Sequence, residues 1–96
     1  MLILITYDVA TETNDGKKRL SKVAKCCIKH GQRVQNSVFE CSLDYGKFLK
    51  MKAELKEIID PKNDSLRFYN LGNNYKNKVE HIGVKSSIPL EGIIVV

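Results

Sequence analysis

The first nine residues, MLILITYDV, form a mostly apolar and β-branched run of strand length. Such a run is typical of a strand that is buried on both faces, so we expect it to lie in the centre of its sheet. A polar loop, residues 10–16, follows with the acids Glu12 and Asp15, and Asn14 or Asp15 can cap the next helix. Asp8 stands where strand and loop meet, and we expect its carboxylate to be close to buried.

Two helices are predicted. Residues 17–30 carry apolar side chains at helical spacing, and Gly31 is expected at the C′ position. The inward-facing stripe comprises Leu20, Val23, Ala24, Cys27 and Ile28. Asp44 caps a second helix, residues 45–59, which stops before Pro61.

The remaining segments indicate strands. Residues 32–42, 65–71 and 77–83 are strand-like, the last short and charged as edge strands often are, and residues 84–90 are a connector. Residues 92–96, GIIVV, are strongly β-forming and need a partner strand. We therefore predict an α+β fold, a ferredoxin-like βαββαβ sandwich with an additional C-terminal strand, in one domain over residues 1–96.

The predicted sandwich leaves one sheet face without helices. One of the aromatic residues Phe39, Phe68 and Tyr69 is then exposed on that face. Large exposed apolar surfaces are typical of interaction sites, so we expect a homodimer formed sheet to sheet and closed by exchange of residues 92–96.

The charge balance is basic. Sixteen Lys and Arg against eleven Asp and Glu give a net charge of +5, which attracts polyanions but equally suits ordinary solubility. Four lysines lie opposite the apolar stripe of the first helix: Lys18, Lys22, Lys25 and Lys29. They are interpreted either as a solvated helix face or as contacts to phosphates.

Composition also excludes several classes. The longest aliphatic run near the N-terminus, residues 2–5, is far too short to span a bilayer and has no charged leader, so neither a membrane protein nor a secreted one is expected. Cys26, Cys27 and Cys41 form no CxxC pair and are interpreted as free buried thiols in a reducing compartment. Because the two histidines lie at no familiar zinc spacing, any metal is expected to have oxygen ligands.

Asp8 admits two interpretations. It can accept backbone N–H bonds and cap the following loop, or it can bind Mg²⁺. A lone carboxylate is a poor magnesium site, because Mg²⁺ usually takes one or two carboxylates together with waters and substrate phosphates. A twofold axis that brings two copies of Asp8 together would correct this deficiency.

Three sequence motifs together resemble a known family. They are Y-D-V at the end of the first strand, K-R-L-S-K-V-A-K on the first helix, and G-Q-R-V-Q-N-S-V-F-E-C. The chain is similar over nearly its whole length to the second core CRISPR-associated protein. The resemblance implies a small ferredoxin-like, metal-dependent nuclease of cytoplasmic antiviral defence, which acts with the CRISPR integrase in spacer acquisition.

The resemblance also implies roles for individual residues. Asp8 looks like the catalytic, metal-binding aspartate, one from each subunit, with Mg²⁺ between them activating a water for attack on the phosphodiester. The expected substrate-binding residues are Tyr7, Arg19, Arg33 and Phe39, the arginines on phosphates and Phe39 at the dimer interface or against a sugar. Ser21 departs from the family pattern, because members often carry a basic residue there.

The sequence leaves function open at three points. The substrate is RNA or duplex DNA. The protein either cleaves or serves as a structural adaptor that binds DNA in the integrase complex. A toxin-like ribonuclease of the virulence-associated D type, which shares the fold, is a further alternative.

Overall fold

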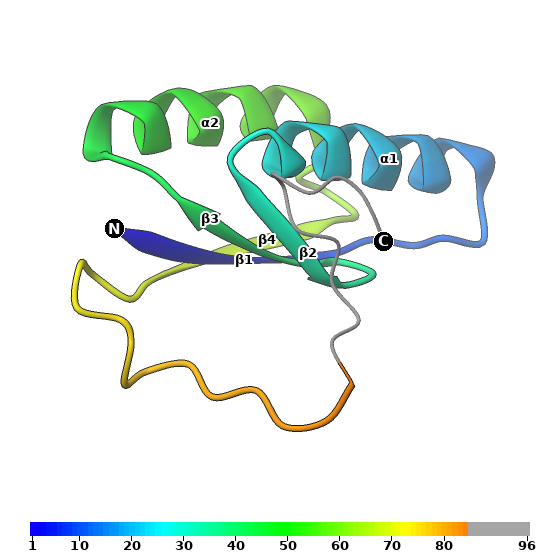
Figure 1. Cartoon of the computed structure of the whole chain (residues 1–96). Helices are drawn as coiled ribbons and strands as arrows, with labels where there is room; N and C mark the ends of the chain where they lie inside the picture. The colour runs from blue at the N-terminus through cyan, green and yellow to red at the C-terminus, as the bar shows by residue number, and fades with distance from the viewer. Residues whose placement is uncertain (85–96) are drawn as a thin grey trace.

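The computed structural model of the chain describes residues 1–84 and shows two layers (Figure 1). In chain order the elements are β1 (Leu2–Asp8), α1 (Asn14–Ile28), β2 (Gly31–Gln35), β3 (Val38–Ser42), α2 (Tyr45–Ile58) and β4 (Ser65–Asn70). The strands form one antiparallel sheet in the order β2-β3-β1-β4, and both helices cover the same face of it. The predicted βαββαβ order is confirmed. The additional strand expected at residues 92–96 lies outside the described residues.

β1 is central, as its sequence predicts, and pairs with β3 on one side and β4 on the other. Ile3, Ile5 and Tyr7 point toward the helices and are fully buried. Leu4 on the opposite face is only half-buried, because no helix covers that face. Burial on both faces is therefore confirmed only in part for β1: Leu2, on the same face as Leu4, is buried, whereas Asp8 at the end of that face is exposed.

The helices supply the other half of the core. Val23, Ala24 and Cys27 of α1 pack with Met51 and Leu55 of α2 in one cluster. These positions repeat at helical spacing, which is why the amphipathic pattern identifies them correctly.

Helix boundaries depend on caps. α1 begins at Asn14 rather than Lys17, because the cap is Thr13, whose hydroxyl accepts a hydrogen bond from the Gly16 amide at 3.0 Å. The predicted cap of α2 is confirmed: Asp44 accepts from the Lys47 amide at 2.8 Å. α2 ends at Ile58, one residue earlier than predicted.

The segment 32–42 is two strands rather than the predicted single strand. β2 and β3 form a hairpin whose turn contains Asn36 and Ser37, both common turn residues. Gly31 is not a helix C′ residue but the first residue of β2, where a Cβ atom would stand 1.8 Å from the Glu40 carbonyl oxygen. This glycine permits close approach of two strands, and the split of the segment supplies the second and third strands of the sandwich.

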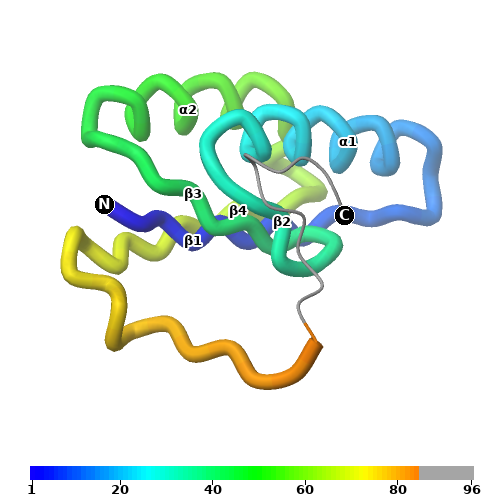
Figure 2. The backbone as a smooth tube through the Cα atoms, in the orientation of Figure 1, coloured from blue at the N-terminus to red at the C-terminus, as the bar shows by residue number. Residues whose placement is uncertain are grey.

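The strand predicted at residues 77–83 is wrong. Just after β4, two backbone hydrogen bonds join the chain to Leu2: the Leu71 amide donates to the Leu2 carbonyl, and the Leu2 amide donates to the Gly72 carbonyl. A turn from Tyr75 to Lys78 follows. The segment from residue 71 to 84 crosses the side of the sheet opposite the helices (Figures 1 and 2). Ile82 is 85% exposed, so its apolar side chain has no packing surface within the described residues.

Register decides which aromatic residue is exposed on the open face. Phe39 and Phe68 both pair with Ile5 and so lie on the helix side, where Phe68 packs edge-on against Phe48 at 5.5 Å between ring centroids. Tyr69 pairs with Leu4 on the open face and is 41% exposed. The prediction that one of three aromatic residues faces outward is confirmed, and that residue is Tyr69.

All three cysteines are free and buried, as predicted. Burial raises the pKa of Cys26 to about 12, so this thiol stays protonated at neutral pH. Within residues 1–84, neither helix combines the length and the hydropathy that a membrane crossing requires.

Candidate functional site

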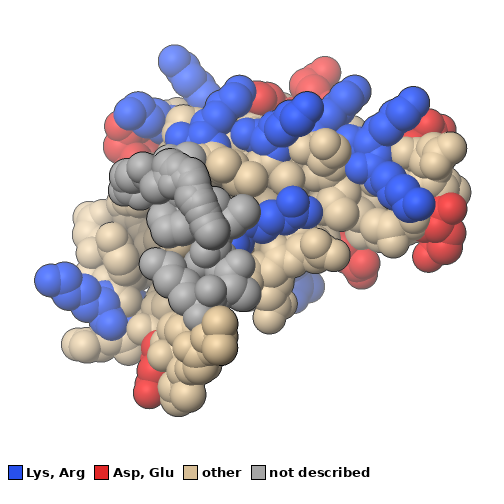
Figure 3. Space-filling model, turned by 45° about the vertical axis from the view of Figure 1, so that its right-hand side comes forward, with Lys and Arg blue, Asp and Glu red and all other residues tan. Residues whose placement is uncertain are grey.

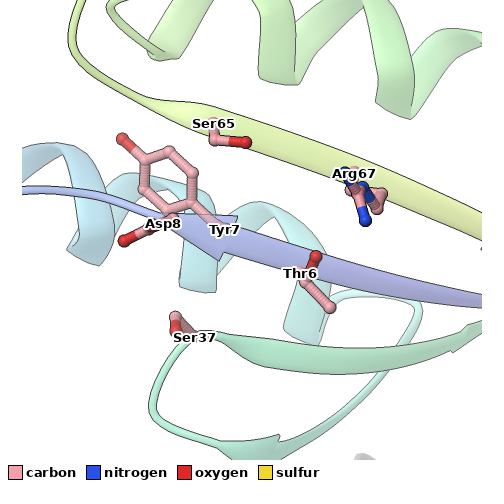
Figure 4. A pocket seen from close by; sticks show the side chains of 6 residues that line it. All are labelled: Thr6, Tyr7, Asp8, Ser37, Ser65 and Arg67. Carbon is pink, nitrogen blue, oxygen red and sulfur yellow. The ribbon is translucent and has the colours of Figure 1, made fainter.

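A cleft of about 350 Å³ lies at the carboxyl end of β1 (Figure 4). Its lining comes from three segments that are distant in sequence: β1, the β2–β3 turn and the start of β4. The lining residues are Thr6, Tyr7, Asp8, Ser37, Ser65 and Arg67. Two backbone relationships hold these segments together, namely the hydrogen bond from the Tyr7 amide to the Ser37 carbonyl at 2.9 Å and the pairing of Asp8 with Ser65.

Asp8 is exposed in this cleft, so the expectation of a nearly buried carboxylate is wrong. It is the last residue of β1, and the alternation along the strand turns its side chain to the uncovered face. No hydrogen bond or ion pair joins its carboxylate to another residue between positions 1 and 84. The described structure therefore does not support the interpretation of Asp8 as a loop cap, and it leaves the carboxylate available to a ligand.

The chemistry of the cleft suits a hard cation. Its side chains offer one carboxylate and the hydroxyls of Thr6, Ser37 and Ser65, and oxygen donors are what Mg²⁺ prefers. No group of three His, Cys, Asp or Glu side chains with metal-site geometry occurs among residues 1–84. One chain thus provides oxygen ligands of the kind that Mg²⁺ prefers, but its single carboxylate supplies little negative charge to hold the ion.

Tyr7 borders the cleft but is only 1% exposed, and its hydroxyl hydrogen bonds to Asp64. Arg19 donates to the same carboxylate through Nε at 2.8 Å and Nη2 at 3.2 Å, and the Asp60 amide donates at 3.0 Å. The Asp64 side chain is fully buried. These contacts tie the end of β1, helix α1 and the start of β4 into one network, which we call the Asp64 network (Tyr7, Arg19, Asp60 and Asp64).

The Asp64 network changes the ionisation of its members. Burial, followed by the hydrogen bond to Asp64, raises the pKa of Tyr7 to about 12. Burial also raises the pKa of Asp64, but the hydrogen bonds from Arg19, Tyr7 and the Asp60 amide outweigh it and hold that pKa below its ordinary value. Asp64 is therefore an ionised, internally neutralised carboxylate, and Arg19 is its counter-ion.

Phe39 is fully buried in the core, so the expected contact with a sugar or a second subunit is wrong. The Arg33 guanidinium lies over its ring, 5.6 Å from the centroid, and Arg33 Nε donates to the Asn36 carbonyl at 2.7 Å. Neither residue lines the cleft. Of the five residues predicted for the site, the structure brings only Tyr7 and Asp8 to it.

Sequence reasoning missed Arg67 and Asp64. Arg67 pairs with Thr6 and so shares the open face with Asp8, a placement that follows from the β1–β4 register. Asp64 directly precedes β4 and looks like an ordinary turn residue in the sequence. The alternation of side chains along residues 65–71 places Arg67 on one face of a strand, but it does not show which of the two faces lies away from the helices.

A second feature lies on the helix layer. The four lysines predicted opposite the α1 stripe, Lys18, Lys22, Lys25 and Lys29, are all exposed. Figure 3 shows Lys and Arg side chains gathered along the top of the molecule over the helices. The four α1 lysines, which we call the α1 lysine face, are separated from the Asp8 cleft by the sheet.

The fold and the cleft define a small ferredoxin-like protein with an oxygen-lined site on the uncovered face of its sheet. Residues 1–79 match the family model described as CRISPR associated protein Cas2. The chain is 63% identical to the CRISPR-associated endonuclease Cas2 of Halalkalibacterium halodurans, over 95% of both chains, and 52% identical to the CRISPR-associated endoribonuclease Cas2 of Chlorobaculum tepidum, over 99% of both. A crystal structure of Streptococcus pyogenes Cas2 at pH 6.5 superposes with a TM-score of 0.79 at 57% identity, covering 86% of this chain and 100% of that one. The chain belongs to the Cas2 family.

Proposed function

We propose that this chain is a metal-dependent endonuclease that hydrolyses phosphodiester bonds of RNA or duplex DNA and acts with the CRISPR integrase in spacer acquisition. The observation that carries the proposal is the exposed Asp8 carboxylate, which has no partner among residues 1–84 and lies in a cleft with three hydroxyls and a guanidinium. The names of the relatives, endonuclease and endoribonuclease, support the same chemistry. The free buried thiols favour a cytoplasmic location.

We further propose a homodimer in which one Asp8 from each chain holds a shared divalent metal ion, Mg²⁺. The uncovered sheet face, with Tyr69 41% exposed, supports association through that face. Exposed Ile82 and Val84, in the segment that crosses the same side, add apolar surface for a partner.

The chain's own residues would each have a defined task. A bound divalent ion supplies charge stabilisation at the phosphate and a water of lowered pKa. Asp8 would hold that ion, and the Ser37 and Ser65 hydroxyls can donate hydrogen bonds to phosphate oxygens. The Asp64 network positions the site, because it fixes the end of β1, where Asp8 lies, against the start of β4.

A second candidate function is that of a non-catalytic adaptor, and the α1 lysine face favours it. Four exposed lysines on one helix can follow a nucleic-acid backbone without any metal. The family match favours a CRISPR role for either function over a toxin-like ribonuclease.

Titration with Mg²⁺ separates the two functions. The purified protein is incubated with labelled RNA and with duplex DNA of the same sequence, first in EDTA and then with increasing Mg²⁺. The nuclease proposal expects cleavage of at least one substrate that rises with Mg²⁺ and stops when EDTA is restored. Binding without cleavage of either substrate at any Mg²⁺ concentration would contradict the nuclease and leave the adaptor.

Replacing Lys18, Lys22, Lys25 and Lys29 by Gln is expected to weaken binding to duplex DNA. Each phosphate contact releases counterions, so the logarithm of affinity should fall with the logarithm of salt by about 0.9 per contact, and the variant should show a shallower slope. Fluorescence anisotropy over a salt series measures both quantities. Unchanged affinity and slope would show that the α1 lysine face is only a solvated helix surface.

A further inference from the structure

We infer that Arg67 is the phosphate-binding arginine of the Asp8 cleft. This inference rests on the proposed function, since it gives the cleft a nucleic-acid phosphodiester as its ligand. It also puts Arg67 in place of Arg19 and Arg33, the arginines that the family resemblance implies for this task.

The three arginines of the chain have different surroundings. Arg19 is only 20% exposed at its side chain and makes two hydrogen bonds to the buried Asp64 carboxylate. The Arg33 guanidinium lies over the Phe39 ring, and Arg33 donates to the Asn36 carbonyl outside the cleft. Arg67 is the arginine that lines the cleft, and it is exposed.

The sheet register places Arg67 on the same face as Asp8. Arg67 pairs with Thr6, and Asp8 pairs with Ser65, two residues before Arg67 on β4. Since side chains two residues apart share a face of a strand, Thr6, Asp8, Ser65 and Arg67 all project from the open face. Figure 4 shows Arg67 beside Thr6 and Asp8 near Ser65 and Ser37.

The Arg67 guanidinium is held in place but keeps donors for a ligand. Its Nη1 donates to the Tyr69 hydroxyl at 3.1 Å, and its central carbon lies 5.9 Å from the Tyr69 ring centroid. Within residues 1–84 no carboxylate pairs with it. A guanidinium has five N–H donors arranged as a planar fork, so those not used by Tyr69 can bind two oxygens of one phosphate.

The neighbouring groups make phosphate binding sensitive to the charge at Asp8. Ser37 and Ser65 add hydroxyl donors for the same anion, whereas a metal-free Asp8 carboxylate repels it. Removing the Asp8 charge should therefore strengthen metal-free binding, and removing the Arg67 charge should weaken it.

Anisotropy of fluorescein-labelled single-stranded RNA and of duplex DNA, both in EDTA, tests the inference without cleavage. Arg67→Gln is expected to bind at least one probe about tenfold more weakly, because a charge-assisted contact to a phosphate is lost. The plot of the logarithm of affinity against the logarithm of salt should become shallower for this variant. The change in slope should be about 0.9 on duplex DNA or about 0.7 on single-stranded RNA for each cleft that binds the probe. Arg67→Lys should keep the slope and lose about threefold in affinity, because the charge remains but the planar fork does not.

Two further variants complete the design. Lys50→Gln removes one exposed charge from α2, on the other side of the sheet, and should bind both probes like the wild type. Asp8→Asn should bind several times more tightly in EDTA, since the repulsion of phosphate is relieved. Arg67→Gln and Asp8→Asn should both keep the wild-type melting temperature, as expected for exposed residues.

The inference would be overturned if Arg67→Gln bound both probes with the affinity and the salt slope of the wild type. An equal loss in Lys50→Gln would also overturn it, because the effect would then reflect net charge rather than the cleft. The proposed nuclease function fails separately, through absence of Mg²⁺-dependent cleavage by the wild type. If cleavage is absent and Arg67→Gln still weakens binding, Arg67 remains a phosphate contact of a binding protein.

Discussion

Asp8→Asn is expected to reduce Mg²⁺-dependent cleavage by about a thousandfold or more, with the fold and the proposed dimer intact. The substitution preserves the shape of the side chain and removes the charge that holds a divalent ion, whose contribution to phosphoryl chemistry is worth several kcal/mol. Because Asp8 is exposed and has no partner among residues 1–84, its loss leaves no buried group unsatisfied. Relief of repulsion between two copies of Asp8 should, if anything, stabilise the metal-free dimer. Cleavage rates with and without EDTA, together with a melting curve, measure both effects.

Asp15→Asn is the matched control for this prediction. Asp15 is an exposed acid in the first turn of α1, near Asp8 in sequence but outside the cleft lining. Its variant should cleave like the wild type. Full activity of Asp8→Asn would remove Asp8 from the mechanism, and Asp15 and Glu12 would be the next carboxylates to test.

Asp64→Ala is expected to lower the free energy of unfolding by about 2 to 3 kcal/mol, a large share of the stability of a small domain. The truncation leaves the buried Tyr7 hydroxyl without its acceptor, and it leaves Arg19, whose side chain is 20% exposed, without its counter-ion. Tyr7→Phe removes one donor from the same carboxylate and should cost only about 1 kcal/mol. Urea unfolding of the three proteins measures the differences. A loss below that of Tyr7→Phe would show that the Asp64 network contributes little to the stability of the fold.

The Asp64 network also predicts how stability changes with pH. The pKa of Asp64 in the folded protein lies below its ordinary value. As pH falls, the unfolded chain therefore takes up a proton at this carboxylate before the folded protein does. The stabilisation from Asp64 is therefore fully present above the ordinary carboxyl pKa and is lost as pH falls through the lowered one. Unfolding free energies over an acidic series should fall more steeply for the wild type than for Asp64→Asn. Parallel pH profiles of the two proteins would contradict this assignment.

How much of this could be predicted from the sequence depends on the range of the interactions involved. The β1 run and the Asp44 cap are local signals, and both identify their elements correctly. The hairpin at Asn36 and Ser37 was missed because the polar middle of residues 32–42 also suits an exposed edge strand. The C-terminal expectations, the strand at residues 92–96 and its exchange, lie outside the described residues.

The site depended on pairings that a single sequence does not contain. The core position of Phe39 follows from its pairing with Ile5, and the open position of Arg67 from its pairing with Thr6. A shift of one residue in the β1–β3 pairing would reverse the assignment of Phe39, and the same shift in the β1–β4 pairing would reverse that of Arg67. The link between Tyr7 and Asp64 joins residues 57 positions apart, and no periodicity reveals it. The family resemblance indicated Asp8 as a site residue without geometry, but it did not show that Arg19 already has a carboxylate partner.

The central claim is that two Asp8 carboxylates, one from each chain, hold one shared metal ion. The most direct test is a mixed dimer of one wild-type and one Asp8→Asn chain, isolated through two different affinity tags and assayed in Mg²⁺ beside the two pure dimers. A shared site predicts that the mixed dimer is nearly inactive, because its single metal site has lost one of its two charged ligands. About half of the wild-type activity would instead show that each chain has its own complete site, and would contradict the shared metal.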